Sequence, residues 1–204
     1  MTTHLFVYLA SQSPRRAQLM DQLGVAHRPL APDPHEDAEA LEEERSNEPP
    51  SEYVRRVTIL KMNAARARLK RRRLPDAPIL CADTTVALGR RILGKPESPE
   101  HAAEMLRTLS GRTHRVMTAV AVSAGRQTIL DVSESRVRFA DLSERTIRFY
   151  VDSGEPMGKA GAYAIQSRIA AWIERIEGSY TGIMGLPLHE TTTLLSRARV
   201  RLDL

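Results

Sequence analysis

The sequence predicts an α/β fold, because strand-like and helix-like segments alternate along its 204 residues. Residues 5–9 have the length and the aromatic and β-branched content of a buried strand, and leucines at helical spacing follow until Gly24. Residues 78–82 form a second apolar run of strand length. Residues 116–122 and 128–139 read as two strands of a hairpin. Together these segments predict a sheet packed against helices.

The remaining elements are predicted from helix capping residues and from the positions of proline and glycine. Residues 29–50 hold several prolines and an acidic run, which predicts a loop. Further helices are expected from about Ser51 to Leu74, from Ser98 to Leu109, from Ser143 to Val151, and at the end around Leu188, Leu194 and Leu195. A Gly-rich segment at 152–162 is followed by two short predicted strands, at 163–166 and 169–176.

The run from Leu9 to Arg16 predicts an anion-binding corner. Ser13 suits the N-cap of the first helix, and Pro14 its first position, so Arg15 and Arg16 fall in the first turn. Two cations there oppose the helix dipole unless an anion arrives. An oligophosphate would meet free backbone N–H groups, the hydroxyls of Ser11 and Ser13, and two guanidinium groups. The alternative is a solvated arginine pair.

Further polar residues break apolar segments where a ligand could bind. Asp83 follows the strand at 78–82, where α/β proteins gather ligands, so it could hold a divalent cation or accept a proton from water, or else cap a turn. Lys61 lies beside the buried stripe of its helix and either reaches water or neutralises phosphate. Lys95 stands on a tight turn, and Lys159 stands beside Gly161, where backbone can approach a ligand closely.

Composition excludes several classes of protein. A hydrophobic content of 42% in 204 residues is typical of a globular chain, and we expect a single domain over residues 1–204. No apolar run approaches the roughly 20 residues that span a bilayer, and we find no export signal, so we expect a cytoplasmic protein. Cys81, the single cysteine, allows no internal disulfide or multi-cysteine metal cluster and is expected to be buried.

The net charge of +5 is unevenly distributed. Acidic residues crowd 36–48 and basic residues crowd 66–73, and such runs usually form solvated faces. The basic run could contact nucleic acid, but aromatic residues make up 4% of the chain and none is interleaved with it. We therefore expect no specific nucleic-acid binding.

Six short motifs, in order along the chain, resemble those of the Maf family of nucleoside triphosphate pyrophosphatases. They occupy residues 9–16, 82–84, 94–96, 160–166, 178–180 and 185–188. The resemblance implies an α/β fold similar to that of the inosine triphosphate pyrophosphatases. The implied fold has a long mixed twisted sheet with helices on both sides and two lobes around a central cleft. The resemblance also implies a homodimer, the common assembly in this family.

Within that family the motifs resemble the branch that hydrolyses dTTP and UTP. The resemblance implies that Asp83 is the proton acceptor, while Arg15, Thr84 and Gln166 match the positions that tune base preference. Ser11, Arg16, Lys61, Lys95 and Glu36 match the set that handles phosphate and metal, here Mg²⁺ or Mn²⁺ held by Asp83 with Glu36. One departure is Ser167, which stands where this branch normally has Gly, before Arg168-Ile169-Ala170-Ala171.

The implied reaction is attack of water on the α-phosphorus, with pyrophosphate leaving. The cationic residues would neutralise the triphosphate, and Gln166, with both a donor and an acceptor, could read uracil or thymine. Modified pyrimidine nucleotides are further possible substrates in a house-cleaning role. Two alternatives stay open: a phosphate-binding module without turnover, and a nucleotide- or nucleic-acid-binding regulator of cell division. The enzyme hypothesis requires the arginine pair and Asp83 to line one pocket.

Overall fold

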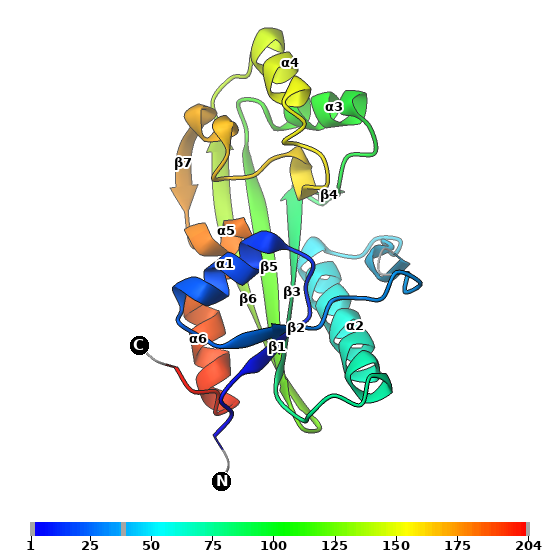
Figure 1. The fold of residues 1–204 in the computed structure, drawn as a ribbon. Helices are drawn as coiled ribbons and strands as arrows, with labels where there is room; N and C mark the ends of the chain where they lie inside the picture. The colour runs from blue at the N-terminus through cyan, green and yellow to red at the C-terminus, as the bar shows by residue number, and fades with distance from the viewer. Residues whose placement is uncertain (1–2, 38–39, 203–204) are drawn as a thin grey trace.

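A single mixed sheet organises the molecule (Figure 1). The structure is a computed structural model and describes residues 3–37 and 40–202. The strand order is β2-β1-β3-β5-β6-β7, with β4 paired to β3; β1 runs parallel to β2 and β3, and the other pairs are antiparallel. The elements are β1 (Val7–Leu9), α1 (Pro14–Gln22), β2 (His27–Pro29), the 3₁₀ helix η1 (Ala40–Glu42), α2 (Pro50–Arg71), β3 (Ile79–Leu88), β4 (Arg91–Leu93), α3 (Pro99–Leu109), β5 (Thr113–Ala124), β6 (Gln127–Phe139), α4 (Glu144–Asp152), the 3₁₀ helices η2 (Ala160–Ala162) and η3 (Arg168–Trp172), β7 (Ile173–Glu177), α5 (Tyr180–Met184) and α6 (Leu188–Arg197).

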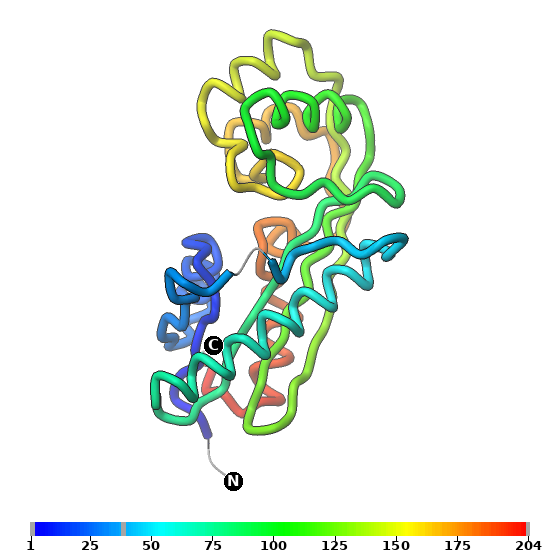
Figure 2. The backbone as a smooth tube through the Cα atoms, turned by 90° about the vertical axis from the view of Figure 1, so that its right-hand side faces the viewer, coloured from blue at the N-terminus to red at the C-terminus, as the bar shows by residue number. Residues whose placement is uncertain are grey.

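The long strands β3, β5 and β6 run through both ends of the molecule and join two lobes (Figures 1 and 2). The lower lobe of Figure 1 contains β1, β2, α1, α2 and α6, and the upper lobe contains β4, α3, α4 and β7. Separate apolar cores fill them. One core gathers α3, α4 and the segment around Tyr163, and the others pack the lower helices onto the sheet. The predicted mixed sheet with two lobes is confirmed.

Successive residues of β3 point to opposite faces of the sheet, so helices cover both faces in the lower lobe. Leu80 and Ala82 belong to the core that contains residues of α1 and α6, whereas Ile79 and Cys81 pack with residues of α2. Cys81 is buried as a free thiol, as expected. In α2 the predicted stripe is correct at Tyr53 and Val57, but farther along the helix Met62 and Ala65 are buried in place of the expected Leu60 and Ala64.

The strand predicted to end before Asp83 continues to Leu88, which corrects the placement of that carboxylate. Asp83 lies in the middle of β3, because β5 pairs with β3 without interruption from Ile79 to Ala87. The polar residues after Ala82 resemble a turn in the sequence, yet the ladder with β5 keeps them extended. Asp83 is therefore held by a central strand rather than by a flexible turn.

The two short strands predicted near the end of the Gly-rich segment are wrong in part. Residues 163–166 lie outside any strand, and residues 168–172 form η3 before β7 begins at Ile173. The chain turns sharply at Gly161 and Ala162, which both have positive φ. A Cβ added to Gly161 would lie 2.8 Å from the Val86 side chain, so this glycine lets the segment pack against β3. The apolar run that follows is buried without belonging to a ladder, which hydrophobicity alone does not distinguish.

None of the helices formed by the described residues combines the length and the apolar character needed to cross a bilayer.

Candidate active site

A cavity of about 740 Å³ lies between the two lobes. The middle of β3 and part of β4 line it together with α1, η1, α2, the turn after β4 and residues of the segment at 158–165. Nearly all of the residues singled out in the sequence meet here: Ser11, Ser13, Arg15, Arg16, Glu36, Lys61, Asp83, Thr84, Lys95 and Lys159 all line the cavity. Gln166 is exposed and does not line it, although its neighbour Ile165 does.

The middle of β3 reaches this cavity because of how its neighbours are arranged. β1 pairs with β3 as far as Leu80, and β4 joins at Val86, so residues 81–85 span the interval between these partners. Polar side chains in this interval lie where the parallel strand β1 ends, the place where α/β proteins gather ligands. Asp83 and Thr84 face opposite sides of the sheet here and still line the same cavity.

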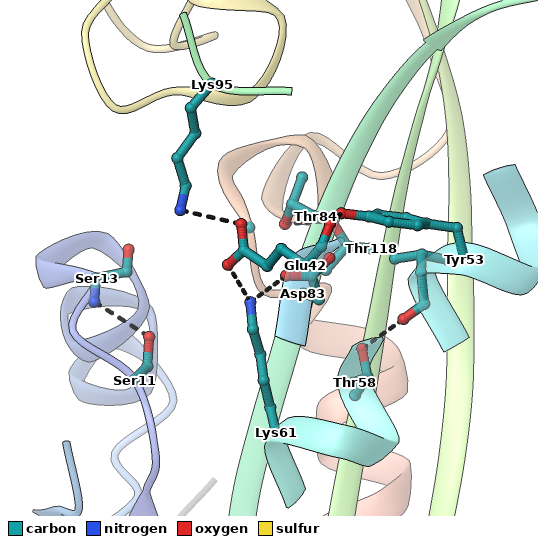
Figure 3. A network of polar contacts seen from close by, with 12 residues as sticks. Ser11, Ser13, Glu42, Tyr53, Thr58, Lys61, Asp83, Thr84, Lys95 and Thr118 are labelled. Carbon is teal, nitrogen blue, oxygen red and sulfur yellow. Dashed lines mark hydrogen bonds and ion pairs between the residues drawn. The ribbon is translucent and has the colours of Figure 1, made fainter. Parts of the chain in front are cut away.

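Lys61 connects two carboxylates at the centre of the site (Figure 3). Its Nζ donates to Asp83 Oδ1 at 2.5 Å and to Glu42 Oε1 at 2.7 Å. Burial lowers the pKa of Lys61, but the charges of Asp83 and Glu42 outweigh this effect and raise it overall. The ammonium therefore stays charged, and its side chain is held beside a carboxylate that is 9% exposed.

Glu42 also reaches the upper lobe, a contact that sequence reasoning missed. Its Oε2 lies 3.0 Å from Lys95 Nζ, while Tyr53 on α2 donates to the Glu42 carbonyl at 2.7 Å (Figure 3). Burial raises the pKa of Glu42, and Lys61 and Lys95 more than reverse that shift. Glu42 stands in an acidic run, and nothing in the run itself distinguishes it from its neighbours.

Arg16 is fixed by contacts from three parts of the chain. Its Nε donates to the Gly185 carbonyl at 2.7 Å, and its Nη atoms donate to Ser11 Oγ and Thr84 Oγ1, both at 3.3 Å. Burial lowers the pKa of Arg16, with partial compensation from Asp83. The motifs at 9–16, 82–84 and 185–188 thus converge on one guanidinium group. Thr84 contributes to that positioning, a contact the sequence did not indicate.

The Arg15 side chain makes fewer hydrogen bonds than that of Arg16 among the described residues. Its Nε is buried and has no hydrogen-bond partner among the described residues, and burial lowers its pKa. Lys159 lies nearby, and burial followed by the charge of Arg15 lowers the pKa of this lysine. Ser13 occupies the N-cap of α1 and Pro14 the first position, as predicted, but the Ser13 hydroxyl makes no capping bond. This corner therefore presents concentrated positive charge to the cavity.

Glu36 lies at the rim of the cavity and binds arginines instead of joining Asp83. Its carboxylate accepts from Arg68 Nε at 3.0 Å and Arg68 Nη2 at 2.5 Å, and Arg71 binds it as well. These hydrogen bonds, led by that of Arg68, lower the pKa of Glu36 to about 2. Glu42 is the carboxylate that the structure brings to Lys61 and Asp83.

The carboxylates of the cavity are candidate ligands of a divalent cation. No group of three or more His, Cys, Asp or Glu side chains within residues 3–37 and 40–202 could enclose a metal ion by itself. However, Asp83 and Glu42 both direct an oxygen at one ammonium group, Lys61 Nζ. Two carboxylates supplemented by substrate phosphates are the usual ligands of Mg²⁺ in phosphate-processing sites. The residues present therefore fit a cation that arrives with a polyphosphate.

The fold and the site define an α/β protein with a cation-lined cleft between two lobes of one mixed sheet. The chain belongs to the Maf family, because the family model described as Maf-like protein matches residues 6–198. A relative from Polaromonas sp. named dTTP/UTP pyrophosphatase is 62% identical over 197 residues, covering 97% of this chain and 98% of the relative.

Two further relatives carry the same name. The protein of Albidiferax ferrireducens is 60% identical and that of Cupriavidus pinatubonensis is 57% identical, over 93% and 97% of this chain and 95% and 99% of their own lengths. The solved structure of the Staphylococcus aureus Ham1 protein overlaps with a TM-score of 0.42 and 16% identity, covering 66% of this chain and 72% of that one. This last likeness is too weak to support an inference.

Proposed function

We propose that this protein is a nucleoside triphosphate pyrophosphatase that hydrolyses dTTP and UTP, and pyrimidine nucleotides with modified bases, to the monophosphate and pyrophosphate. The observation that carries the proposal is the position of Asp83. This rigidly held carboxylate faces the same cavity as Arg15, Arg16, Lys61 and Lys95. A module that only bound phosphate would gain nothing from a carboxylate in that place. The names of the relatives support the same reaction and substrates.

In the proposed reaction, water attacks the α-phosphorus, and the bond from that phosphorus to the bridging oxygen of the β-phosphate breaks. Asp83 accepts the proton that the water loses, and pyrophosphate leaves with the bridging oxygen. Negative charge grows on the equatorial and leaving oxygens, where Arg15, Arg16 and Lys95 would stabilise it. Lys61 would hold Asp83 in place and bind a phosphate oxygen with a remaining donor.

A divalent cation, Mg²⁺ or Mn²⁺, would be held by Asp83 and Glu42 together with substrate oxygens. When bound, such an ion polarises the phosphoryl group and lowers the pKa of a coordinated water. The family resemblance implies Glu36 as the second carboxylate. Two arginines bind Glu36, whereas both lysine partners of Glu42 line the cavity and Lys61 also binds Asp83, which favours Glu42 as the second ligand.

Base preference is assigned to Arg15, Thr84 and Gln166. The Thr84 hydroxyl and the Arg15 guanidinium line the cavity, while Gln166 is exposed beside the lining residue Ile165. Ser13 and Lys159 would add contacts to phosphate from opposite walls. A cytoplasmic location, a homodimer and a single domain over residues 1–204 complete the proposal. The continuous strands β3, β5 and β6 support the single domain.

The alternative of a nucleic-acid-binding regulator finds less support. Arg66, Arg68, Arg71 and Arg72 of the basic run at the end of α2 bind groups within the chain. Arg66 donates to the carbonyls of Gly125 and Gln127, and Arg68 donates to Glu36 and to the Leu30 carbonyl. These contacts give the run a structural role.

The experiment is a panel of nucleoside triphosphates with Mg²⁺ or Mn²⁺, with pyrophosphate detected directly. Wild-type protein should release pyrophosphate fastest from dTTP and UTP. Asp83→Asn should lose turnover by about 10²-fold or more while still binding nucleotide, because it removes the general base.

Asp131→Asn makes the same change on an exposed part of β6 and should behave as wild type. Full activity in Asp83→Asn would remove that residue from catalysis, and an inert wild type would overturn the enzyme proposal.

A further inference from the structure

Ser167 and Tyr150 complete a closed ring of hydrogen bonds behind the cavity wall. The Ala164 N–H lies 3.3 Å from Tyr150 Oη, the Ser167 hydroxyl donates to the Ala164 carbonyl at 2.8 Å, and the two hydroxyl oxygens lie 2.9 Å apart. Because the Ser167 proton goes to the carbonyl, Tyr150 donates to Ser167. Each hydroxyl then donates once and accepts once, so the ring has a single direction and no unsatisfied member.

The ring is anchored to a helix, with Tyr150 and Ala164 buried and Ser167 half-buried. Tyr150 on α4 is fully buried, and burial raises the pKa of its hydroxyl, which therefore keeps the proton that the ring requires. On the cavity side, Tyr163 is fixed separately, since its hydroxyl lies 2.8 Å from Nε2 of the buried His114. The turn at 163–167 is thus held at both ends.

This turn carries part of the apolar wall of the cavity. Tyr163 and Ile165 line the cavity, and so do the apolar side chains of Val86, Val116 and Ile183, which belong to the same core. A triphosphate would occupy the cationic part of the cavity, which leaves the apolar part for the base. A residue without a hydroxyl at position 167 could not close the ring.

We propose that Ser167 and Tyr150 are positioning residues that lock the 163–167 turn against the base, and thereby set nucleotide affinity and base discrimination in this chain. The inference rests on the proposed pyrophosphatase function. Without the ring, the turn must be ordered when nucleotide binds, and ordering lowers affinity without touching the reacting phosphorus.

The test compares Ser167→Ala and Tyr150→Phe, which open the ring, with Ser167→Thr, which keeps the hydroxyl. The two open variants should raise KM for the preferred triphosphate by about three- to tenfold with kcat within about twofold, as the loss of one buried hydrogen bond suggests. They should also narrow the preference among bases, and the Ala164 amide should exchange its hydrogen faster. Ser167→Thr should restore wild-type values.

Ser153→Ala is the matched control, because the Ser153 hydroxyl donates to the Tyr150 carbonyl outside the ring. It should lower the melting temperature slightly and leave KM unchanged. Unchanged KM and base ranking in Ser167→Ala, with wild-type protein active, would overturn this inference alone. An inert wild type would instead overturn the proposed function. If Tyr150→Phe does not fold, the comparison of Ala with Thr at position 167 still decides.

Discussion

The hydroxyl of Thr84 takes part in two hydrogen bonds. It accepts from Arg16 and lies 2.9 Å from Thr118 Oγ1, whose own proton goes to the Gly182 carbonyl. Thr84 therefore donates to Thr118 and supports Arg16, which leaves its hydroxyl one acceptor position and no donor for a base. Gln166 differs, because its exposed amide takes part in no hydrogen bond among the described residues. Of these two candidates, Gln166 has its donor and acceptor available.

Replacing Gln166 with Glu should change the ranking of bases more than the rate with the best substrate. A carboxylate accepts hydrogen bonds but cannot donate one, so it loses any pairing with a carbonyl of uracil or thymine. We expect the ratio of kcat/KM between preferred and poor nucleotides to shift on the order of tenfold. Gln127→Glu on exposed β6 is the matched control. An unchanged ranking would show that Gln166 does not read the base.

Sequence reasoning identified residues that stand in compact motifs and missed one that does not. Ser11 and Arg16 were found because a strand, a turn and a helix start follow one another within a few residues. Glu42 was missed because its neighbours are also acidic, and its role comes from Lys61 and Lys95, which are distant in sequence. Convergence of this kind depends on the tertiary fold.

At the scale of elements, the carboxyl end of α2 clamps the segment at 30–36. Arg68 donates to the Leu30 carbonyl and to Glu36, and Arg71 and Arg72 both bind Asp33. Hydrogen bonds from Arg71 and then Arg72 lower the pKa of Asp33 to about 2. This clamp holds the rim of the cavity, since Pro32 and Glu36 line it.

The clamp predicts loss of stability in acid. The folded-state pKa of Glu36, about 2, lies below its ordinary value of 4.5, so its contribution is complete above about pH 4.5 and disappears as the pH falls toward 2. In Glu36→Gln the free energy of unfolding, measured by denaturant titration, should fall less steeply across this window. Glu104→Gln, a change at an exposed position on α3, should keep the wild-type slope. Equal slopes in both variants would show that the ion pairs contribute no net stability.

Helices that begin at a capping residue were predicted well, whereas segments whose structure depends on pairing or packing with distant residues were not. Ser98 and Ser143 cap their helices through side-chain bonds, as their sequence context indicates. The end of β3 was misplaced because the run from Asp83 to Thr85 resembles a turn, and only pairing with β5 keeps it extended. The segment after Gly161 was predicted as a strand because it is apolar, although it packs in the upper core without strand partners.

At the scale of the whole molecule, Glu42 links the two lobes across the cavity. One carboxylate oxygen binds Lys61 on α2 of the lower lobe, and the other binds Lys95 on the turn after β4 of the upper lobe (Figure 3). Both lysines are assigned to phosphate in the proposed function. The Glu42 carboxylate therefore lies where the proposed function places phosphate, between the lobes.

Glu42→Gln should therefore have opposite effects on binding and on turnover. A neutral amide competes more weakly with phosphate for Lys61 and Lys95, so UTP should bind about three- to tenfold more tightly in EDTA, equivalent to roughly 1 kcal/mol. With Mg²⁺, turnover should fall because one carboxylate ligand is lost. Isothermal titration in EDTA and pyrophosphate release in Mg²⁺ measure the two effects.

Glu43→Gln, at the exposed neighbouring position, should change neither nucleotide binding nor turnover. Weaker binding in EDTA would show that Glu42 does not compete with phosphate for the two lysines.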